Sequence, residues 1–279
     1  MKASVILPLR GNQDHLRKVI FSLQNQSFQP DEVIISDGNA DEKVVEFLNQ
    51  EKGNCSFSIR YIRQLECSEN GAQCRNNAIR ASRGSILILL EESLVFSRDL
   101  LKTFIDTVQE NSFVVAHPIL LSKEQSAGVT QEVINANNLF SVLTDKQNKQ
   151  LDKVLKDKQF KRFLFKSGSS DLAAELTEAA YCIWKHDLKK VNNKKKKITG
   201  WGGEYIDLGR RLYNAGFQRK SPGKNDFTLR LFRESRSDNN RNPNYEKQRF
   251  VQINKGDYDC LFGLSNPVND NITLFLDIK

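Results

Sequence analysis

Short apolar runs alternate with longer amphipathic segments through the N-terminal part of the chain. Runs of this kind, bounded by polar or turn-forming residues, predict buried strands. They lie at residues 4–7, 33–36, 59–62 and 86–90. Between them, apolar positions recur with helical spacing over residues 15–24, 41–49 and 70–82. Strands and helices that alternate in this way, with continuously apolar strands, predict a mostly parallel sheet covered by helices on both faces.

Further features extend the pattern on both sides. Asp14 precedes the first helical segment and is expected to cap its N-terminus. Residues 113–121 form another apolar run, which predicts a single strand, and residues 272–276 predict a last one. The order of elements is that of a Rossmann-like nucleotide-binding fold.

Polar clusters follow three of the predicted strands. They are Pro8-Leu9-Arg10, Asp37-Gly38-Asn39 and Glu91-Glu92-Ser93. Ligands of open α/β sheets bind outside the carboxyl ends of the strands, so these clusters predict a binding site at one edge. Each cluster alone is also typical of an ordinary turn between a strand and a helix. The first strand lacks a following Gly-x-Gly-x-x-Gly and the chain lacks a Walker lysine motif, which argues against NAD and against a P-loop.

A glycine-rich loop with a tryptophan leads into another predicted helix at residues 200–212. The sequence Gly-Trp-Gly-Gly-Glu ends at Glu204, and Tyr205, Leu208 and Leu212 then share one apolar face. Glycine allows close backbone approach, so the loop is suited to surround a ligand. Glu204 stands at the helix N-terminus, where a carboxylate is favoured by the free N–H groups and the helix dipole. A capped surface helix behind a tight turn is the alternative.

Composition narrows the functional classes. The chain has 279 residues, 39% of them hydrophobic, 5 cysteines and a net charge of +8. We expect reduced cysteines and a cytoplasmic location, because no metal-type cysteine spacing and no long apolar run occurs. Part of the charge lies in Lys194–Lys197, which predicts either a solvated loop or a peripheral contact with an anionic membrane. Nucleic acid is not expected, since aromatic residues are not interleaved on a basic face.

Several of these segments together resemble family 2 and galactosyltransferase-like glycosyltransferases of the GT-A fold. The opening strand, the strand ending in Asp-Gly-Asn, the segment Gly71–Ile79 and the stretch Ile86–Leu101 occur in the order of the family's motifs. The loop Trp201-Gly202-Gly203-Glu204 matches the acceptor and base motif, which in the family usually continues with aspartate. Here Tyr205 stands in that place.

The resemblance implies a fold, a domain organisation and an activity. The expected domain covers residues 1–225, with a nucleotide-sugar half (1–100) and an acceptor half (101–225), and residues 226–279 form a C-terminal extension. The expected reaction is inverting transfer of a sugar from a UDP-linked nucleotide sugar to a glycan, a lipid-linked acceptor or another hydroxyl, as in polysaccharide biosynthesis. Neither NAD nor haem is expected as a cofactor.

The resemblance also assigns roles to individual residues. Glu204 is the expected catalytic base, with Asp207 as the alternative. Donor-binding candidates are residues at the strand ends, in the third helix and near residue 230: Pro8, Arg10, Asp37, Arg75, Glu91, Glu92, Ser93, Arg230 and Arg233. Acceptor-binding candidates lie in and after the glycine loop: Trp201, Gly202, Gly203 and Tyr205.

The metal motif departs from that of the family. Glu91 and Glu92 remain as weak candidate ligands for Mn²⁺ or Mg²⁺, but Ser93 occupies the position of the usual aspartate, and a hydroxyl is a poor hard ligand. A stretch that carries a histidine ligand in many relatives here contains Arg230 and Arg233. We therefore expect action without a metal, with arginine neutralising the diphosphate. The alternative is a catalytically degenerate protein that binds a nucleotide sugar, glycan or partner without turnover.

Overall fold

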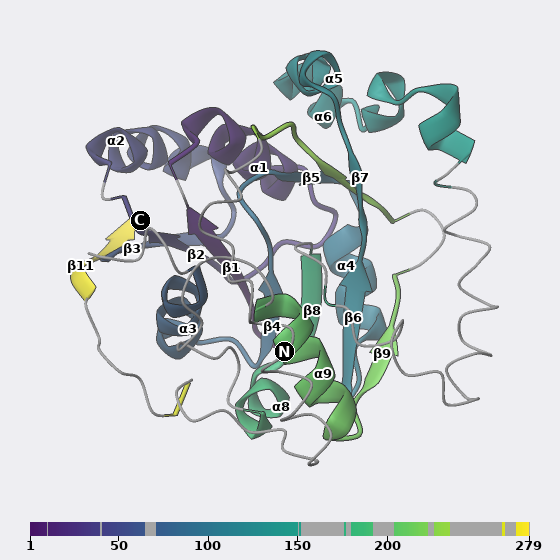
Figure 1. Cartoon of the computed structure of the whole chain (residues 1–279). Helices are drawn as coiled ribbons and strands as arrows, with labels where there is room; N and C mark the ends of the chain where they lie inside the picture. The colour runs from purple at the N-terminus through teal and green to yellow at the C-terminus, as the bar shows by residue number, and fades with distance from the viewer. Residues whose placement is uncertain are drawn as a thin grey trace.

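The described strands form two sheets (Figure 1). The computed structural model describes residues 1–9, 11–39, 41–64, 71–149, 151, 176, 180–191, 204–222, 226–234, 264–265 and 272–278. Within these ranges, an 8-stranded sheet has the order β11-β3-β2-β1-β4-β8-β6-β9. Its strands are β1 (Ala3–Leu9), β2 (Glu32–Asp37), β3 (Ser58–Gln64), β4 (Ile86–Leu89), β6 (Ser112–Ala116), β8 (Ala180–Trp184), β9 (Gln218–Lys220) and β11 (Ile272–Ile278).

Strand direction decides where ligands can approach this sheet. β1 pairs in parallel with β2 and β4, and β2 pairs in parallel with β3. β8 runs antiparallel to both β4 and β6, so β6 points the same way as β1. The carboxyl ends of β1, β2, β4 and β6 therefore lie along the same end of the sheet, across the strands. We call this end of the sheet the carboxyl edge and the opposite end the amino edge. The predicted mostly parallel sheet is confirmed, with β8 and β11 as antiparallel members.

Helices cover both faces of this sheet, as Figure 1 shows. One face packs against α1 (Gln13–Gln24), α2 (Glu42–Glu51) and α4 (Leu100–Thr107). The other face packs against α3 (Gly71–Ala81), α8 (Lys185–Lys190) and α9 (Glu204–Asn214). Leu16, Val19, Ile20 and Leu23 of α1 are fully buried, which confirms the helical spacing predicted for them. Tyr205, Leu208 and Leu212 of α9 are buried in the same manner, as the sequence predicts.

Two local predictions are wrong. The N-cap of α1 is Asn12, whose side chain accepts a hydrogen bond of 3.0 Å from the His15 backbone N–H, while Asp14 lies in the first turn. The single strand predicted over 113–121 is divided at His117 into β6 and β7 (Pro118–Leu120), which belong to different sheets. The apolar run continues because β6 is fully buried between the two cores of the large sheet, whereas β7 is partly buried in a third core.

The second described sheet is 3-stranded, in the order β5-β10-β7, with β5 at Leu94–Phe96 and β10 at Thr228–Arg230. β10 is antiparallel to β5 and parallel to β7. Short helices α5 (Lys123–Gly128) and α6 (Gln131–Asn135) and the 3₁₀ turn Leu139–Val142 pack near it, around a separate apolar cluster. β10 thereby brings a segment of the predicted C-terminal extension beside the strand that follows Glu91 and Glu92.

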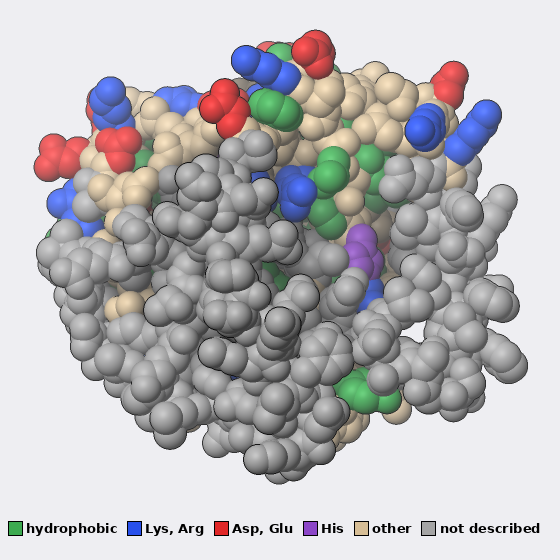
Figure 2. Space-filling model, viewed as in Figure 1, with side chains coloured by type: hydrophobic (Ala, Val, Ile, Leu, Met, Phe, Trp, Pro, Cys, Tyr) green, Lys and Arg blue, Asp and Glu red, His purple; other side chains and the backbone are tan. Residues whose placement is uncertain are grey.

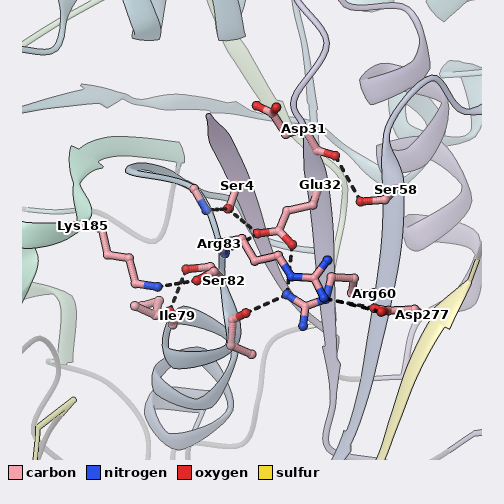
Figure 3. A network of polar contacts seen from close by, with 12 residues as sticks. Ser4, Asp31, Glu32, Ser58, Arg60, Ile79, Ser82, Arg83, Lys185 and Asp277 are labelled. Atoms are coloured by element: carbon pink, nitrogen blue, oxygen red, sulfur yellow. Dashed lines mark hydrogen bonds and ion pairs between the residues drawn. The ribbon is translucent and has the colours of Figure 1, made fainter. Parts of the chain in front are cut away.

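β11 completes the other end of the large sheet. It pairs antiparallel with β3, from Ile272 opposite Gln64 to Ile278 opposite Ile59. Polar contacts at the amino edge hold it there (Figure 3): Arg60 donates from Nε to Asp277 at 3.0 Å and from Nη1 to Glu32 at 3.0 Å. The division of the chain at residue 225 stays a prediction, but β10 and β11 both pair with strands of the first 225 residues.

The described helices are also informative about membranes. Within the ranges given above, no helix combines the length and the apolar character needed to cross a bilayer.

Figure 2 shows one face of the molecule. Along the top of this view, where the residues are described, basic and acidic side chains are intermixed.

Candidate active site

Glu91 is the centre of the polar contacts at the carboxyl edge. It follows Leu90 at the end of β4, and its residue is only 4% exposed. Its Oε1 accepts a hydrogen bond of 2.6 Å from Arg75 Nη2 and another from the Tyr205 hydroxyl. Its Oε2 lies 3.4 Å from Arg233 Nη1. One buried carboxylate therefore joins α3, α9 and the segment after β10 at the point where β4 ends.

Arg75 is the most deeply buried cation of this group, with an exposed fraction of 1%. Its guanidinium lies over the ring of Tyr205, with Cζ 4.6 Å from the ring centroid. A cation over an aromatic face gains electrostatic attraction, more so when water is excluded. Arg75, Glu91 and Tyr205 consequently form one packed unit, which the sequence analysis had divided between the donor and acceptor sides.

Backbone contacts hold Arg233 in position. Leu231 N–H donates to the Ser93 carbonyl at 2.8 Å, and Phe232 N–H donates to Ser126 Oγ at 2.7 Å. His15, on α1, lies close enough to Arg233 to feel its charge. Burial lowers the pKa of His15, and the nearby Arg233 charge acts in the same direction. The segment that carries Arg233 is thus held by backbone contacts to the chain after β4 and to α5.

Asp37 lies at the carboxyl end of β2 and is fully buried. Its Oδ1 accepts from the Asn39 N–H at 2.8 Å, and its Oδ2 accepts from the Asp41 N–H at 3.2 Å and from the Tyr61 hydroxyl at 2.7 Å. Burial, with the Asp37 contact next in size, raises the pKa of Tyr61, so the phenol stays a donor. Asp37 shapes the turn after β2, and its expected role in base or ribose binding stays a prediction.

Three other donor candidates are placed as follows. Pro8 is buried in β1 opposite Ser36 of β2. Ser93 is fully buried just before β5, and its hydroxyl finds no hydrogen-bond partner among the described residues. Arg230, at the end of β10, lies opposite Leu94 and Leu120 in the small sheet and is half-buried. Arg233 is therefore the arginine of this pair that the structure brings to Glu91.

Part of the expected site lies outside the described residues. Arg10, the loop Trp201-Gly202-Gly203 and the lysines Lys194–Lys197 belong to that part. α9 begins at Glu204, as the sequence predicts, but the side chains of Glu204 and Asp207 are also outside the description. The catalytic and acceptor assignments of these residues stay predictions.

The metal question can be examined at Glu91. Both of its oxygens already face donors from the described part of the chain, and these donors include two guanidinium groups. A divalent cation at this carboxylate would compete with Arg75 and Arg233 and would be repelled by both. The buried Ser93 hydroxyl adds no anionic ligand. Among the described side chains, no three His, Cys, Asp or Glu residues are grouped in a way that could hold a metal. The donor set around Glu91 suits guanidinium better than Mn²⁺.

Sequence reasoning missed several contributors to this edge. Tyr61 donates to Asp37, Ser126 accepts from the backbone next to Arg233, and His15 lies near the Arg233 charge. The residue types of these three give no signal of such a role. Tyr205 carried a signal, because a large side chain replaces the aspartate expected by resemblance, but its contact with Glu91 joins positions 114 residues apart.

Comparison with known proteins identifies the group to which this site belongs. Residues 4–171 match the family described as Glycosyl transferase family 2, which is more than half of the chain. A protein of Bacillus subtilis (strain 168), named "Uncharacterized glycosyltransferase YfnE", is 24% identical over 243 residues, covering 77% of this chain. The alignment covers 61% of that relative, so the chain spans about three-fifths of its length.

Solved structures show the same fold. S. aureus TarS 1-349 in complex with UDP-GlcNAc matches with a TM-score of 0.62 and 15% identity, over 95% of this chain and 69% of that one. The mannosyltransferase PcManGT from Pyrobaculum calidifontis, in complex with GDP-Man and Mn²⁺, matches with a TM-score of 0.55 and 11% identity, over 90% and 61%. The chain therefore has the α/β architecture of GT-A glycosyltransferases and belongs to glycosyl transferase family 2.

Proposed function

We propose that the protein transfers a sugar from a UDP-linked nucleotide sugar to a hydroxyl acceptor, with inversion at the transferred carbon. Family membership supports the reaction class, and the TarS complexes with UDP-GlcNAc and UDP support the choice of nucleotide. The observation that carries the proposal is the convergence of Arg75 and Arg233 on Glu91 at the carboxyl edge. This is the edge at which α/β sheets bind ligands, and two guanidinium groups there suit a diphosphate.

In the proposed donor site, Arg233 supplies the positive charge for the leaving diphosphate. Its ion pair with Glu91 is long, at 3.4 Å, and its side chain is 28% exposed, so it can turn toward a phosphate oxygen. One unit pair at 4 Å contributes about 4 kcal/mol at an effective dielectric of 20. Arginine also offers two parallel donors that match phosphate oxygens. Asp37, at the end of β2, is proposed to accept from the base or ribose.

The proposed chemistry is a direct displacement. Glu204 takes the proton of the acceptor hydroxyl, whose oxygen attacks the anomeric carbon as the bond to the nucleoside diphosphate breaks. A tyrosine phenol holds its proton at neutral pH, so Tyr205 cannot replace the aspartate of the family motif as base. Asp207 is the alternative base, one turn further along α9.

The proposal also covers the metal requirement, the acceptor and the location of the protein. Charge neutralisation by arginine makes Mn²⁺ or Mg²⁺ dispensable, in contrast to PcManGT, which was solved with Mn²⁺. The acceptor is proposed to be a glycan or a lipid-linked glycan in polysaccharide biosynthesis. The protein is proposed to be cytoplasmic, with Lys194–Lys197 contacting an anionic membrane surface.

Nucleotide binding and donor cleavage test the proposal in sequence. Calorimetry with UDP, with single-stranded DNA as the control, is expected to show binding of UDP alone. Slow hydrolysis of UDP-N-acetylglucosamine or another UDP-sugar is then compared in wild type, Glu204→Gln and Asp207→Asn. Loss of a general base costs about 10²–10⁴-fold, so Glu204→Gln should bind UDP normally and lose most turnover.

Each outcome of this experiment has a definite meaning. A fully active Glu204→Gln with an inactive Asp207→Asn moves the base to Asp207. UDP binding without turnover of any UDP-sugar, with and without Mn²⁺, favours the alternative of a degenerate binding protein. Absence of UDP binding contradicts the proposed donor.

A further inference from the structure

Tyr205 has an arrangement that the family motif does not explain. It is the second residue of α9 and is only 4% exposed, and its hydroxyl donates to Glu91 Oε1. Arg75 reaches the same oxygen at 2.6 Å and covers the Tyr205 ring. The phenol is therefore directed at Glu91 on the carboxyl edge, and the buried Arg75 guanidinium packs against its ring.

The rest of α9 is anchored separately from this contact. Leu208 and Leu212 are fully buried in the apolar cluster on that face of the large sheet. These two residues hold the middle of the helix, whereas Tyr205 holds its first turn. The contact between Tyr205 and Glu91 determines how the first turn of α9 lies relative to the carboxyl edge. Glu204 is the preceding residue, so the same contact determines where its backbone lies.

We propose that Tyr205 is a positioning residue that couples the first turn of α9, and with it Glu204, to the occupancy of the nucleotide site through Glu91. This inference rests on the proposed function. When a diphosphate draws Arg233 away from Glu91 Oε2, the carboxylate keeps fewer donors and becomes a stronger acceptor for Tyr205 and Arg75. Nucleotide binding thus tightens the start of α9, so that the backbone carrying the proposed base is held more firmly when a donor is present.

Amide hydrogen exchange measures this coupling without turnover. In wild type, saturating UDP is expected to slow exchange in peptides covering residues 204–214 by about fivefold, because a stronger Tyr205–Glu91 hydrogen bond opposes local opening of the helix. Tyr205→Phe removes only the hydroxyl and should abolish this slowing, and by reciprocity the Kd for UDP, measured by calorimetry, should rise by no more than the same factor of about fivefold. Tyr213→Phe, which removes a hydroxyl near the other end of the same helix, is the matched control and should behave as wild type.

The outcomes separate this inference from the proposed function. Lack of UDP binding by wild type overturns both. Slowing by UDP that persists in Tyr205→Phe overturns the coupling alone. A loss of UDP affinity of about tenfold or more in Tyr205→Phe also overturns it, because Tyr205 would then contact the nucleotide sugar directly. Should Tyr205→Phe fail to fold, Glu91→Gln with saturating UDP makes the same test from the other partner. Slowing retained in that variant also overturns the coupling.

Discussion

The two edges of the large sheet each bury a glutamate paired with arginine, and the two sites are built differently. At the amino edge, Glu32 accepts from Ser4 Oγ and from the Arg83 N–H, both at 2.6 Å, and from Arg60 at 3.0 Å. Arg60 also donates to the Ala81 carbonyl and to Asp277 (Figure 3). At the carboxyl edge, Glu91 faces two arginines and a phenol drawn from separate elements.

The difference lies in the balance of charge and in the nature of the donors. Arg60 and Arg83 face two carboxylates, Glu32 and Asp277, and much of the amino-edge network consists of contacts with the backbone. Such a network is satisfied within the protein and stabilises the fold. At Glu91, by contrast, two guanidinium groups share one carboxylate. Guanidinium groups gathered at the carboxyl edge are the kind of charge that attracts an anionic ligand.

The largest expected effects come from removing the two glutamates. Glu32→Ala and Glu91→Ala each remove a carboxylate that a buried arginine faces, which costs up to about 3–5 kcal/mol of the free energy of unfolding. Urea unfolding measures this cost, and calorimetry at a temperature where both variants are folded measures the Kd for UDP. Glu32→Ala should leave the Kd for UDP at its wild-type value, whereas Glu91→Ala should change that Kd. Equal UDP affinities in the two variants would remove the functional distinction between the edges.

The two ends of β2 offer a second contrast, with a smaller effect. Asp37→Ala should weaken UDP binding about ten- to a hundredfold, the equivalent of one charge-assisted hydrogen bond of about 1.5–3 kcal/mol. Asp31→Ala is the matched control, because Asp31 precedes the same strand and accepts from the Ala3 N–H at 2.7 Å. It should reduce stability and leave UDP binding unchanged. An unchanged Kd in Asp37→Ala excludes Asp37 from the nucleotide site.

The arginines near β10 give a third, smaller contrast. Arg233→Ala should raise the Kd for UDP about three- to tenfold, less than for a fully buried contact because its side chain is 28% exposed. Arg230→Ala should have a weaker effect, since Arg233 is the member that reaches Glu91.

UDP binding and sugar-nucleotide turnover by the wild-type protein should survive EDTA. Activity that vanishes in EDTA, returns with Mn²⁺ and is insensitive to both arginine substitutions contradicts arginine neutralisation.

The smallest expected effect is a pH dependence at the amino edge. Burial would raise the pKa of Glu32, but hydrogen bonds from Ser4, Arg83 and Arg60 and the Arg60 charge outweigh it, and the pKa is lowered from its ordinary 4.5. Below pH 4.5 the unfolded state takes up the proton first, so the stability that Glu32 contributes is present above that pH and is lost as pH falls through the lowered pKa. The difference in Tm between wild type and Glu32→Gln should shrink in this acid range. A difference that is constant down to pH 3 contradicts this assignment.

Much of the fold follows from local sequence, and much of the site does not. The strands and helices up to the end of β4 were predictable because each carries its own apolar period, and the strand ends located Asp37 and Glu91 at one edge. The division of residues 113–121 was not predictable, since both halves are apolar and only the pairing partners differ.

The contacts of Glu91 illustrate why the remainder was hidden. Arg75 lies 16 positions from Glu91, but Arg233 lies 142 positions away, and which arginine near β10 would reach it depends on the register of that strand. Pairing between distant segments leaves no period in the sequence. The resemblance placed Tyr205 at the acceptor side, whereas the packing of α9 turns its hydroxyl toward Glu91.

The pairing of β11 with β3 has a consequence for the synthesis of the chain. Arg60 and Asp277, which form the contact between these strands, are separated by 217 positions. At about 5–20 residues per second, roughly ten to forty seconds pass between their emergence from the ribosome. During this time β3 lacks its β11 partner, and its outer rim is a template for pairing with other chains. The nascent protein is therefore exposed to such pairing until β11 emerges.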